Sequence, residues 1–333
     1  MEAREDFRTA IASQPQWMKK TAELATEALK SADIKPWAQN ETVVVVGMGS
    51  SCNAGAVLTE ALRARGVRAV NVGAATVAHY PEGFTLGDHV ILVSESGRSP
   101  EPIAAALRMG QKPIVITNDP TSPAAELGDI IVPLGGFMDS GVFTIGYITT
   151  LVALAAVAEA HGAPVADLGT LAGIAEVALS QFATSLKPVA AELDKATYLD
   201  FVGQGTSHGS AQAAALYFRE STGIPTAAHE TIEYLHGSME CAGPGAAVLL
   251  LGDARERPIA PQLRQVGATV IGFAAHPGEE LPDYHRLEIA APGYASAIAE
   301  TVFTQCLAAD LAELRDRTVG KFQFEHADTK IPE

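Results

Sequence analysis

The chain has 333 residues, of which 23 are Lys or Arg and 39 are Asp or Glu, so its net charge at pH 7 is −16. Hydrophobic residues make up 47% of the chain and charged residues 19%, a composition typical of globular proteins rather than disordered ones. The excess of acidic residues would repel a phosphodiester backbone, which argues against a nucleic-acid-binding protein. The length predicts two domains.

Cysteine content and hydropathy exclude several further classes. Cys52, Cys241 and Cys306 are too few and too far apart for a disulfide framework, and no Cys/His spacing is typical of a zinc site. The N-terminal sequence MEAREDFRTA has neither the basic nor the apolar region of a secretion signal. The longest apolar runs, such as 151–158, are much shorter than the ~20 residues that cross a bilayer. We therefore expect a soluble, cytoplasmic α/β protein without a membrane segment, metal or cofactor.

Apolar residues at helical spacing occupy the first 32 residues, and Pro15 predicts a break before a second helix over 16–31. Strands and helices then alternate, with β-branched apolar runs as strands. In the first half the expected elements are strand 43–47, helix 54–65, strand 89–93, helix 100–110, strands 113–119 and 129–134, and helix 141–161. In the second half they are strand 198–203, helix 210–222, strands 246–253, 268–275 and 286–291, and helix 296–315. This alternation predicts parallel sheets with helices on both faces.

The two halves resemble each other in sequence. VVVVGMGSSCNAGAVLTEALRARG (43–66) aligns with LDFVGQGTSHGSAQAAALYFREST (199–222), so that Ser50 and Ser51 fall on Thr206 and Ser207. The two segments are 156 residues apart, which is about one domain length and indicates a duplicated domain. We expect an N-terminal helical segment (1–30), a first domain (31–165) and a second one (190–316). A C-terminal tail (317–333) is expected to lie over the active site.

A glycine-rich loop follows the first predicted strand. GMGSSCNAG (47–55) places glycines between a buried strand and a helix, where backbone amides can point at an anion. The loop matches the dinucleotide pattern GxGxxG only in part, because Cys52 holds the third glycine position. No GK[ST] follows, which excludes a Walker A loop. A tight turn without a ligand is the alternative interpretation.

Three hydroxyls surround a glycine in the loop after the next predicted strand. VSESGRSPE (93–101) contains Ser94, Ser96 and Ser99 around Gly97. Ser99 alone would be read as a helix N-cap, but a cap needs neither three serines nor a central glycine. Hydroxyls and helix N-terminal amides bind phosphate monoesters well, and loops after adjacent parallel strands converge. The two loops together predict binding of a phosphorylated small molecule.

With these motifs the chain resembles the sugar isomerase (SIS) family in its double-domain form. The matching segments extend over nearly the whole chain: ASQPQW (12–17), GMGSS (47–51), SESGRS (94–99), ITNDPTSPAAELGD (116–129), RES (219–221) and EYLHGS (233–238). The arrangement is similar to the isomerase half of glutamine–fructose-6-phosphate aminotransferase and to stand-alone sugar-phosphate isomerases, deaminases and deglycases. The resemblance implies an α/β fold of two tandem SIS domains, each a flavodoxin-like or Rossmann-like sheet in three layers.

The resemblance also implies a hexose 6-phosphate-type substrate. Its phosphate would be held by Ser94, Ser96 and Ser99, with Ser50 and Ser51 nearby.

Two positions of the phosphate loop depart from the family pattern. Glu95 stands where the family usually has Gln, and Arg98 where it usually has Glu. A carboxylate beside a phosphate dianion is unfavourable, and Arg98 would offset it. Glu95 is therefore expected to bind a sugar hydroxyl, or else the charge of the substrate differs from the usual one.

Isomerisation of a ketose phosphate moves a proton between adjacent carbons, which requires a base at the carbon and an acid at the ring oxygen. Glu220 is the best candidate for the base, because it ends a helix with an apolar face, where an acidic group is unfavourable unless it is used or paired. An ion pair with Arg219 or a solvent-facing turn is the alternative.

The resemblance implies that His236 promotes ring opening and reaches into the site of a neighbouring subunit, so we expect at least a homodimer with shared active sites. Glu233, one helical turn earlier, would orient its imidazole. His229 is close enough in sequence to be a rival. A surface histidine without a role is the alternative for His236.

The polar tail GKFQFEHADTKIPE (320–333) would ordinarily be disordered. The resemblance implies that it folds over the sugar and that Lys330 reaches the substrate. A lysine there can neutralise an enolate oxygen or open the ring through a Schiff base.

The expected function is an isomerase or deaminase of an amino-sugar or ketose 6-phosphate, similar to glucosamine-6-phosphate deaminase/isomerase. No catalytic cysteine follows Met1, so no release of ammonia from glutamine is expected. A deglycase of fructosyl-amino-acid 6-phosphates is the second possibility. A non-catalytic sugar-phosphate sensor is the third; such proteins usually have one SIS domain and a DNA-binding domain, for which the first 40 residues are too few and too acidic.

Overall fold

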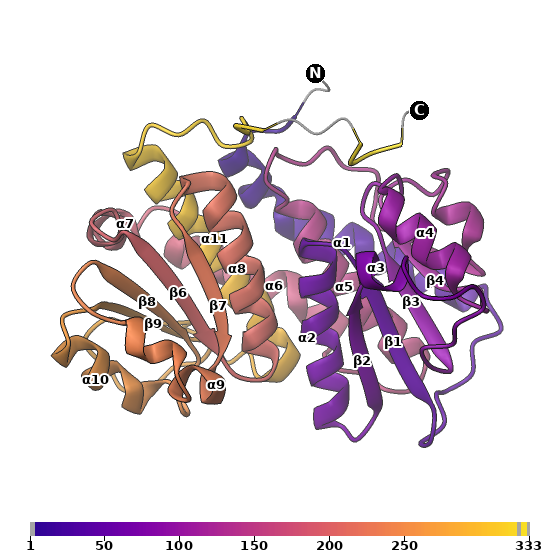
Figure 1. The fold of residues 1–333 in the computed structure, drawn as a ribbon, viewed down its shortest axis with the longest axis horizontal. Helices are drawn as coiled ribbons and strands as arrows, with labels where there is room; N and C mark the ends of the chain where they lie inside the picture. Colours follow the sequence, from indigo (N-terminus) through magenta and orange to yellow (C-terminus); the bar gives the residue numbers. More distant parts are fainter. Residues whose placement is uncertain (1–3, 325–327, 332–333) are drawn as a thin grey trace. The chain divides into compact units, whose positions relative to one another are not determined.

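The computed structural model describes residues 4–324 and 328–331 and divides into two compact units, each with one five-stranded parallel sheet (Figure 1). The β1–β5 unit comprises Gln14–Met138, Ile145–Ala172 and the tail from Gln323. The β6–β10 unit comprises the residues up to Ser13, Asp139–Thr144 and Gly173–Phe322. The predicted α/β class with two parallel sheets is confirmed.

Both sheets have the same strand order. The first contains β1 (Thr42–Gly47), β2 (Arg68–Gly73), β3 (His89–Val93), β4 (Ile114–Thr117) and β5 (Ile130–Pro133), in the order β2-β1-β3-β4-β5. The second contains β6 (Tyr198–Gly203), β7 (Thr226–Glu230), β8 (Ala246–Leu251), β9 (Thr269–Ala274) and β10 (Tyr284–Arg286), in the order β10-β9-β8-β6-β7. Numbered within each unit, this is the flavodoxin-like order 2-1-3-4-5, which reverses direction beside its first strand.

Helices cover both faces of each sheet. The α-helices are α1 (Phe7–Lys30), α2 (Ser50–Ala64), α3 (Ala74–Val77), α4 (Pro100–Arg108), α5 (Ile145–Ala160), α6 (Leu168–Phe182), α7 (Lys187–Leu193), α8 (Thr206–Thr222), α9 (Thr231–Leu235), α10 (Ala260–Gln265) and α11 (Ser296–Leu314). Short 3₁₀ helices are η1 (Ala125–Leu127), η2 (Ser238–Cys241), η3 (Arg257–Ile259) and η4 (Gly293–Ala295). In the β1–β5 unit, α2 and α5 pack on one face and α3 and α4 on the other; in the β6–β10 unit, α8 and α11 pack on one face and α9 and α10 on the other.

Central strands are buried on both faces, as their β-branched and aliphatic composition predicts. Val43 through Val46 of β1 are fully buried, and every residue of β8 is buried. Helix α5 is buried along almost its whole length, which accounts for the apolar run at 151–158. Within residues 4–324 and 328–331, no helix is both long enough and apolar enough to span a membrane.

The predicted break at Pro15 is wrong, because α1 runs through it as one helix. Proline removes one backbone hydrogen bond, but a stripe of buried residues continues past it, including Ile11, Met18, Ala25 and Leu29. Burial of that stripe outweighs the local preference.

The edge strands also differ from the prediction. The sequence predicted neither β2 nor β7, because neither has a continuous apolar run. The last strand, β10, occupies Tyr284–Arg286 rather than the predicted 286–291. Edge strands have one neighbour only, so their sequences carry a weaker apolar pattern.

Candidate functional site

The loops after β1 and β3 lie at the point where the strand order of the first sheet reverses. β1 pairs with both β2 and β3, and its residue Val46 is in register with Leu92 of β3, so these two strands end at the same level. Ligands of open α/β sheets bind at the carboxyl ends of strands beside such a reversal. The topology thus brings both predicted hydroxyl loops to one edge of the sheet.

The β3–α4 loop can only be built around a glycine. Gly97 has φ +62°, and a Cβ atom there would lie 1.8 Å from Ser122 Oγ and 3.1 Å from Thr117 Oγ1. Its N–H donates to the carbonyl of Ser94 at 3.0 Å, which closes the turn. Ser122 is fully buried, and within the described chain its hydroxyl has no hydrogen-bond partner. The tight turn orients the flanking serines.

The serine hydroxyls of this loop are not used for helix capping. Ser99 is the N-cap residue of α4, but its side chain makes no capping hydrogen bond. Ser96 Oγ accepts from the N–H of Arg98 at 3.3 Å. Instead, the amine of Lys330 donates to Ser96 Oγ at 2.5 Å and to Ser99 Oγ at 3.2 Å, while Ser94 is almost fully buried. The structure therefore brings the predicted tail lysine to two of the predicted phosphate-binding serines.

The two unusual residues of the loop have separate environments. Arg98 donates to Asp119 Oδ2 at 3.2 Å, and the pKa of Asp119 is lowered by hydrogen bonds from Thr121 and by Arg98. The main-chain carbonyl of Glu95 accepts from the N–H of Asn118 at 2.7 Å, which fixes the loop to the end of β4. The guanidinium of Arg98 is thus already matched by a carboxylate.

In the β1–α2 loop, Ser50 and Ser51 form the first turn of α2 and are half-buried. Gly49 precedes them with φ +55°, and a Cβ atom on Gly47 would lie 2.8 Å from the backbone of Ser51. The helix therefore approaches the strand end closely, as the glycines predict.

In the β6–β10 unit the aligned hydroxyls are bonded internally. Ser207 Oγ donates to Glu300 Oε1 at 2.6 Å, and Thr206 Oγ1 donates to the carbonyl of Gly293 at 3.2 Å. Glu300 is almost completely buried, and burial raises its pKa. The second loop therefore lacks the free hydroxyls that a phosphate requires.

Glu220 lies in the last turn of α8 and is half-buried. Burial raises its pKa to about 7, an effect that the charge of Arg219 reduces only in part. The guanidinium of Arg219 donates to the carbonyl of Thr226. A carboxyl group with such a pKa can both accept and release a proton near neutral pH.

His236 caps the C-terminal end of α9 and is exposed. Its backbone N–H donates to the carbonyl of Glu233 at 3.0 Å, and no hydrogen bond or ion pair joins the Glu233 carboxylate to the imidazole in the described residues. The expectation that Glu233 orients His236 is therefore not met within the described chain.

A polar cluster lies between β6, β7 and α9, and the sequence analysis named only its histidine, His229. Asp200 is 5% exposed; His229 Nε2 lies 3.3 Å from its Oδ1, and the hydroxyl of Tyr234 donates to its Oδ2 at 3.3 Å. Burial raises the pKa of Asp200, and His229 acts against that shift. The available signal was a carboxylate inside the strand sequence YLDFVG.

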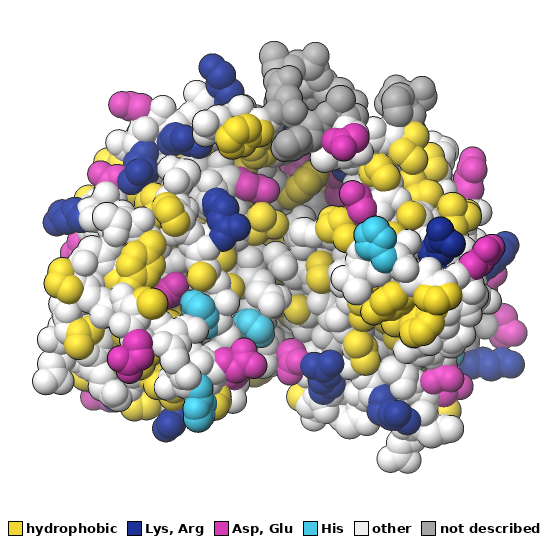
Figure 2. Space-filling model, viewed as in Figure 1, with side chains coloured by type: hydrophobic (Ala, Val, Ile, Leu, Met, Phe, Trp, Pro, Cys, Tyr) yellow, Lys and Arg dark blue, Asp and Glu magenta, His cyan; other side chains and the backbone are white. Residues whose placement is uncertain are grey.

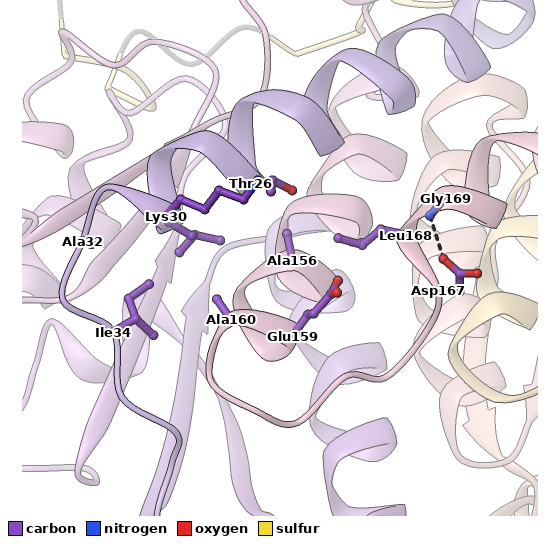
Figure 3. Close-up of a pocket in the computed structure, with 11 residues that line it drawn as sticks. Thr26, Lys30, Ala32, Ile34, Ala156, Glu159, Ala160, Asp167, Leu168 and Gly169 are labelled. Carbon is purple, nitrogen blue, oxygen red and sulfur yellow. Dashed lines mark hydrogen bonds between the residues drawn. The ribbon is translucent and has the colours of Figure 1, made fainter.

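A pocket of 570 Å³ in the β1–β5 unit is formed by the ends of α1 and α5 and the start of α6 (Figure 3). It contains Lys30, Glu159 and Asp167, none of them an expected site residue. Asp167 accepts the N–H of Gly169 at 3.0 Å, an ordinary helix cap. The pocket is therefore not the candidate for substrate binding.

On the face shown in Figure 2, Lys and Arg side chains are scattered among Asp and Glu. In the part of the chain that the structure describes, no group of three or more His, Cys, Asp or Glu side chains is arranged to hold a metal ion.

Several solved structures share this fold. The C-terminal domain of glucosamine-fructose-6-phosphate aminotransferase from Francisella tularensis superposes with a TM-score of 0.80 at 17% identity, over 96% of this chain and 99% of that one. Glucosamine-6-phosphate deaminase from Thermotoga maritima superposes with a TM-score of 0.75 at 21% identity, over 95% of this chain and 97% of that one. Tagatose-6-phosphate ketose/aldose isomerase from Escherichia coli superposes with a TM-score of 0.75 at 17% identity, over 94% of this chain and 93% of that one.

None of the curated proteins matches the sequence. The model of the SIS domain matches twice, at residues 37–160 and 192–315, and each match contains one of the two sheets. The chain therefore belongs to the SIS domain family, with two domains in tandem.

Proposed function

We propose that the protein is a sugar-phosphate isomerase or deaminase that moves a proton between C1 and C2 of an amino-sugar or ketose 6-phosphate. The observation that carries the proposal is the cluster of Ser96, Ser99 and the Lys330 amine at the reversal point of the first sheet. Family membership supports it, as do the structural neighbours, whose names place them among enzymes of six-carbon sugar phosphates.

The phosphate end of the substrate is bound by the β3–α4 loop. The hydroxyls of Ser96 and Ser99 donate to phosphate oxygens. Ser50 and Ser51 belong to the neighbouring loop after β1 and complete the set of donors at this edge of the sheet.

Proton transfer is assigned to Glu220. Above pH 7 its carboxylate is mostly ionised and accepts a proton from the sugar carbon, and with its pKa of about 7 it returns that proton to the adjacent carbon at little cost. No cofactor is required, since the carbonyl of the open-chain sugar already acidifies the C–H bond.

Turnover on phosphorylated and unphosphorylated hexosamines tests the proposal. Release of ammonia or isomerisation is expected with hexosamine 6-phosphates and not with the free sugars. If thermal shifts show binding without turnover on any member of the panel, the protein is a sensor and not an enzyme. Turnover of only fructosyl-amino-acid 6-phosphates would identify a deglycase.

The Ser96→Ala substitution should raise KM for the phosphorylated substrate by about 10-fold or more, because a hydrogen bond to a charged group is lost, and should change kcat less. Initial-rate kinetics measure both constants. Ser31→Ala, at an exposed serine after α1, serves as the matched control and should leave both unchanged. A Ser96→Ala variant with unchanged KM would contradict the placement of the phosphate.

We also propose a homodimer in which His236 serves the active site of the partner subunit, a role that fits its exposed imidazole. Glu220→Gln and His236→Ala subunits, each inactive alone, should regain about one quarter of wild-type activity when coexpressed one to one, because half of the dimers would be mixed and each would have one intact site. Activity after coexpression and the sedimentation profile are the measurements. No recovery in verified mixed dimers would show that both residues act within one chain.

A further inference from the structure

The C-terminal tail lies on the β3–α4 loop. The amine of Lys330 donates to Ser96 Oγ at 2.5 Å and to Ser99 Oγ at 3.2 Å. The backbone N–H of Ile331 donates to the carbonyl of Arg98 at 2.8 Å. Side chain and main chain therefore both attach the tail to the loop, and all of these residues belong to the β1–β5 unit.

The loop itself does not carry the positive charge that a phosphate needs. Glu95 lies within it, and Glu101 is in the first turn of α4. Arg98 is paired with Asp119 at 3.2 Å. A phosphate monoester near neutral pH carries between one and two negative charges, which these carboxylates would repel. The ammonium group of Lys330 supplies a positive charge in contact with the two serine hydroxyls.

The direction of the hydrogen bonds leaves the serine hydroxyls able to bind an anion. An ammonium group only donates, so the oxygens of Ser96 and Ser99 accept from Lys330. Each hydroxyl keeps its own O–H for donation to a further acceptor. One phosphate can then accept from both hydroxyls, with the ammonium group beside them.

We infer that Lys330 is a phosphate-binding residue, which with Ser96 and Ser99 holds the phosphate end of the substrate instead of acting at its carbonyl end. The inference rests on the proposed function and changes the role that the family resemblance implies for this lysine. It also explains how a loop containing Glu95 accepts an anion: the compensating cation comes from the tail and not from the loop.

Inorganic phosphate is the first probe, because it tests the loop without the sugar. In the full chain, Lys330→Met should weaken phosphate binding by about 10-fold or more, and Lys330→Arg should retain most of it. Lys112→Met removes an exposed lysine before β4 in the same unit and should leave the Kd for phosphate unchanged. With glucosamine 6-phosphate as the second probe, Lys330→Met should raise KM by a similar factor and lower kcat by less than about 3-fold.

The opposite pattern would overturn the inference. A Lys330→Met variant with wild-type phosphate affinity and kcat lowered by about 100-fold would place the amine at the carbonyl, as would a borohydride-trapped sugar adduct on Lys330. A wild-type chain that does not bind phosphate would overturn it as well. If the wild type binds phosphate through Lys330 but converts no hexose phosphate, the inference stands and the proposed function fails.

Discussion

Replacing Glu220 by Gln is expected to lower kcat by about 10²- to 10⁴-fold, the usual loss when a general base is removed. The amide has the shape of the carboxyl group but cannot accept the proton from the sugar carbon. Substrate binding should persist, because the proposed phosphate site consists of serines of another loop. Exchange of solvent deuterium into the sugar reports the same proton transfer and should stop.

Glu233→Gln is the matched control, since Glu233 is an exposed carboxylate at the start of α9 and should be replaceable without loss of exchange. If Glu220→Gln exchanges deuterium at the wild-type rate, Glu220 is not the base. Should the control lose exchange instead, that role passes to Glu233.

The pH dependence gives a readout of Glu220 that does not depend on activity. Its pKa in the folded chain is about 7, above the ordinary value of 4.5, so between these values the folded state binds the proton more tightly than the unfolded state. Its contribution to stability is therefore present below pH 4.5 and is lost as pH rises to about 7. The amide of Glu220→Gln does not ionise, so the variant does not lose stability as the pH rises. It should therefore unfold at a higher temperature than the wild type at pH 8.

Replacing Gly97 by Ala is expected to destabilise the β1–β5 unit by about 2–6 kcal/mol and to abolish phosphate binding. The residue has φ +62°, which is strained for alanine by about 1–3 kcal/mol, and the added Cβ would lie 1.8 Å from Ser122 Oγ. Overpacking of this kind adds about 1–3 kcal/mol. Chemical unfolding and phosphate titration measure the two effects.

Gly66→Ala separates strain from overlap, because Gly66 has φ +81° and nothing within 4 Å of the added Cβ. This substitution should lower the free energy of unfolding by only about 1–3 kcal/mol and leave phosphate binding intact. Combining Gly97→Ala with Ser122→Gly should recover part of the lost stability, since the overlapping hydroxymethyl group is removed. Equal destabilisation by Gly97→Ala and Gly66→Ala would show that the contact with Ser122 is unimportant.

The sequence predicted the central part of both sheets because buried parallel strands carry long aliphatic runs. VVVVG and AAVLLL form β1 and β8. The domain duplication inferred from the aligned glycine loops agrees with the identical strand orders of the two sheets. The edge strands β2 and β7 were missed because half-exposed residues such as those of RAVNVG and TAAHE carry no strong pattern.

Of the candidate site, the sequence located the loops but not the contacts within them. Lys330 lies 234 positions along the chain from Ser96, and no local pattern reports a contact over that separation. The same holds for Asp200 and His229, which come together only through the pairing of β6 with β7. Long-range contacts depend on how strands are ordered, which local periodicity does not encode.

The bond between Ser207 and Glu300 gives the glycine loops of the two domains different hydrogen-bonding capacities. In the second domain the hydroxyl that aligns with Ser51 already donates to a carboxyl group of the chain itself. That hydroxyl forms an internal tie between α8 and α11 and has no hydrogen left to donate to an external anion. Under the proposed function, recognition of the phosphate therefore rests on the first domain, and the second domain can vary in sequence without loss of phosphate binding.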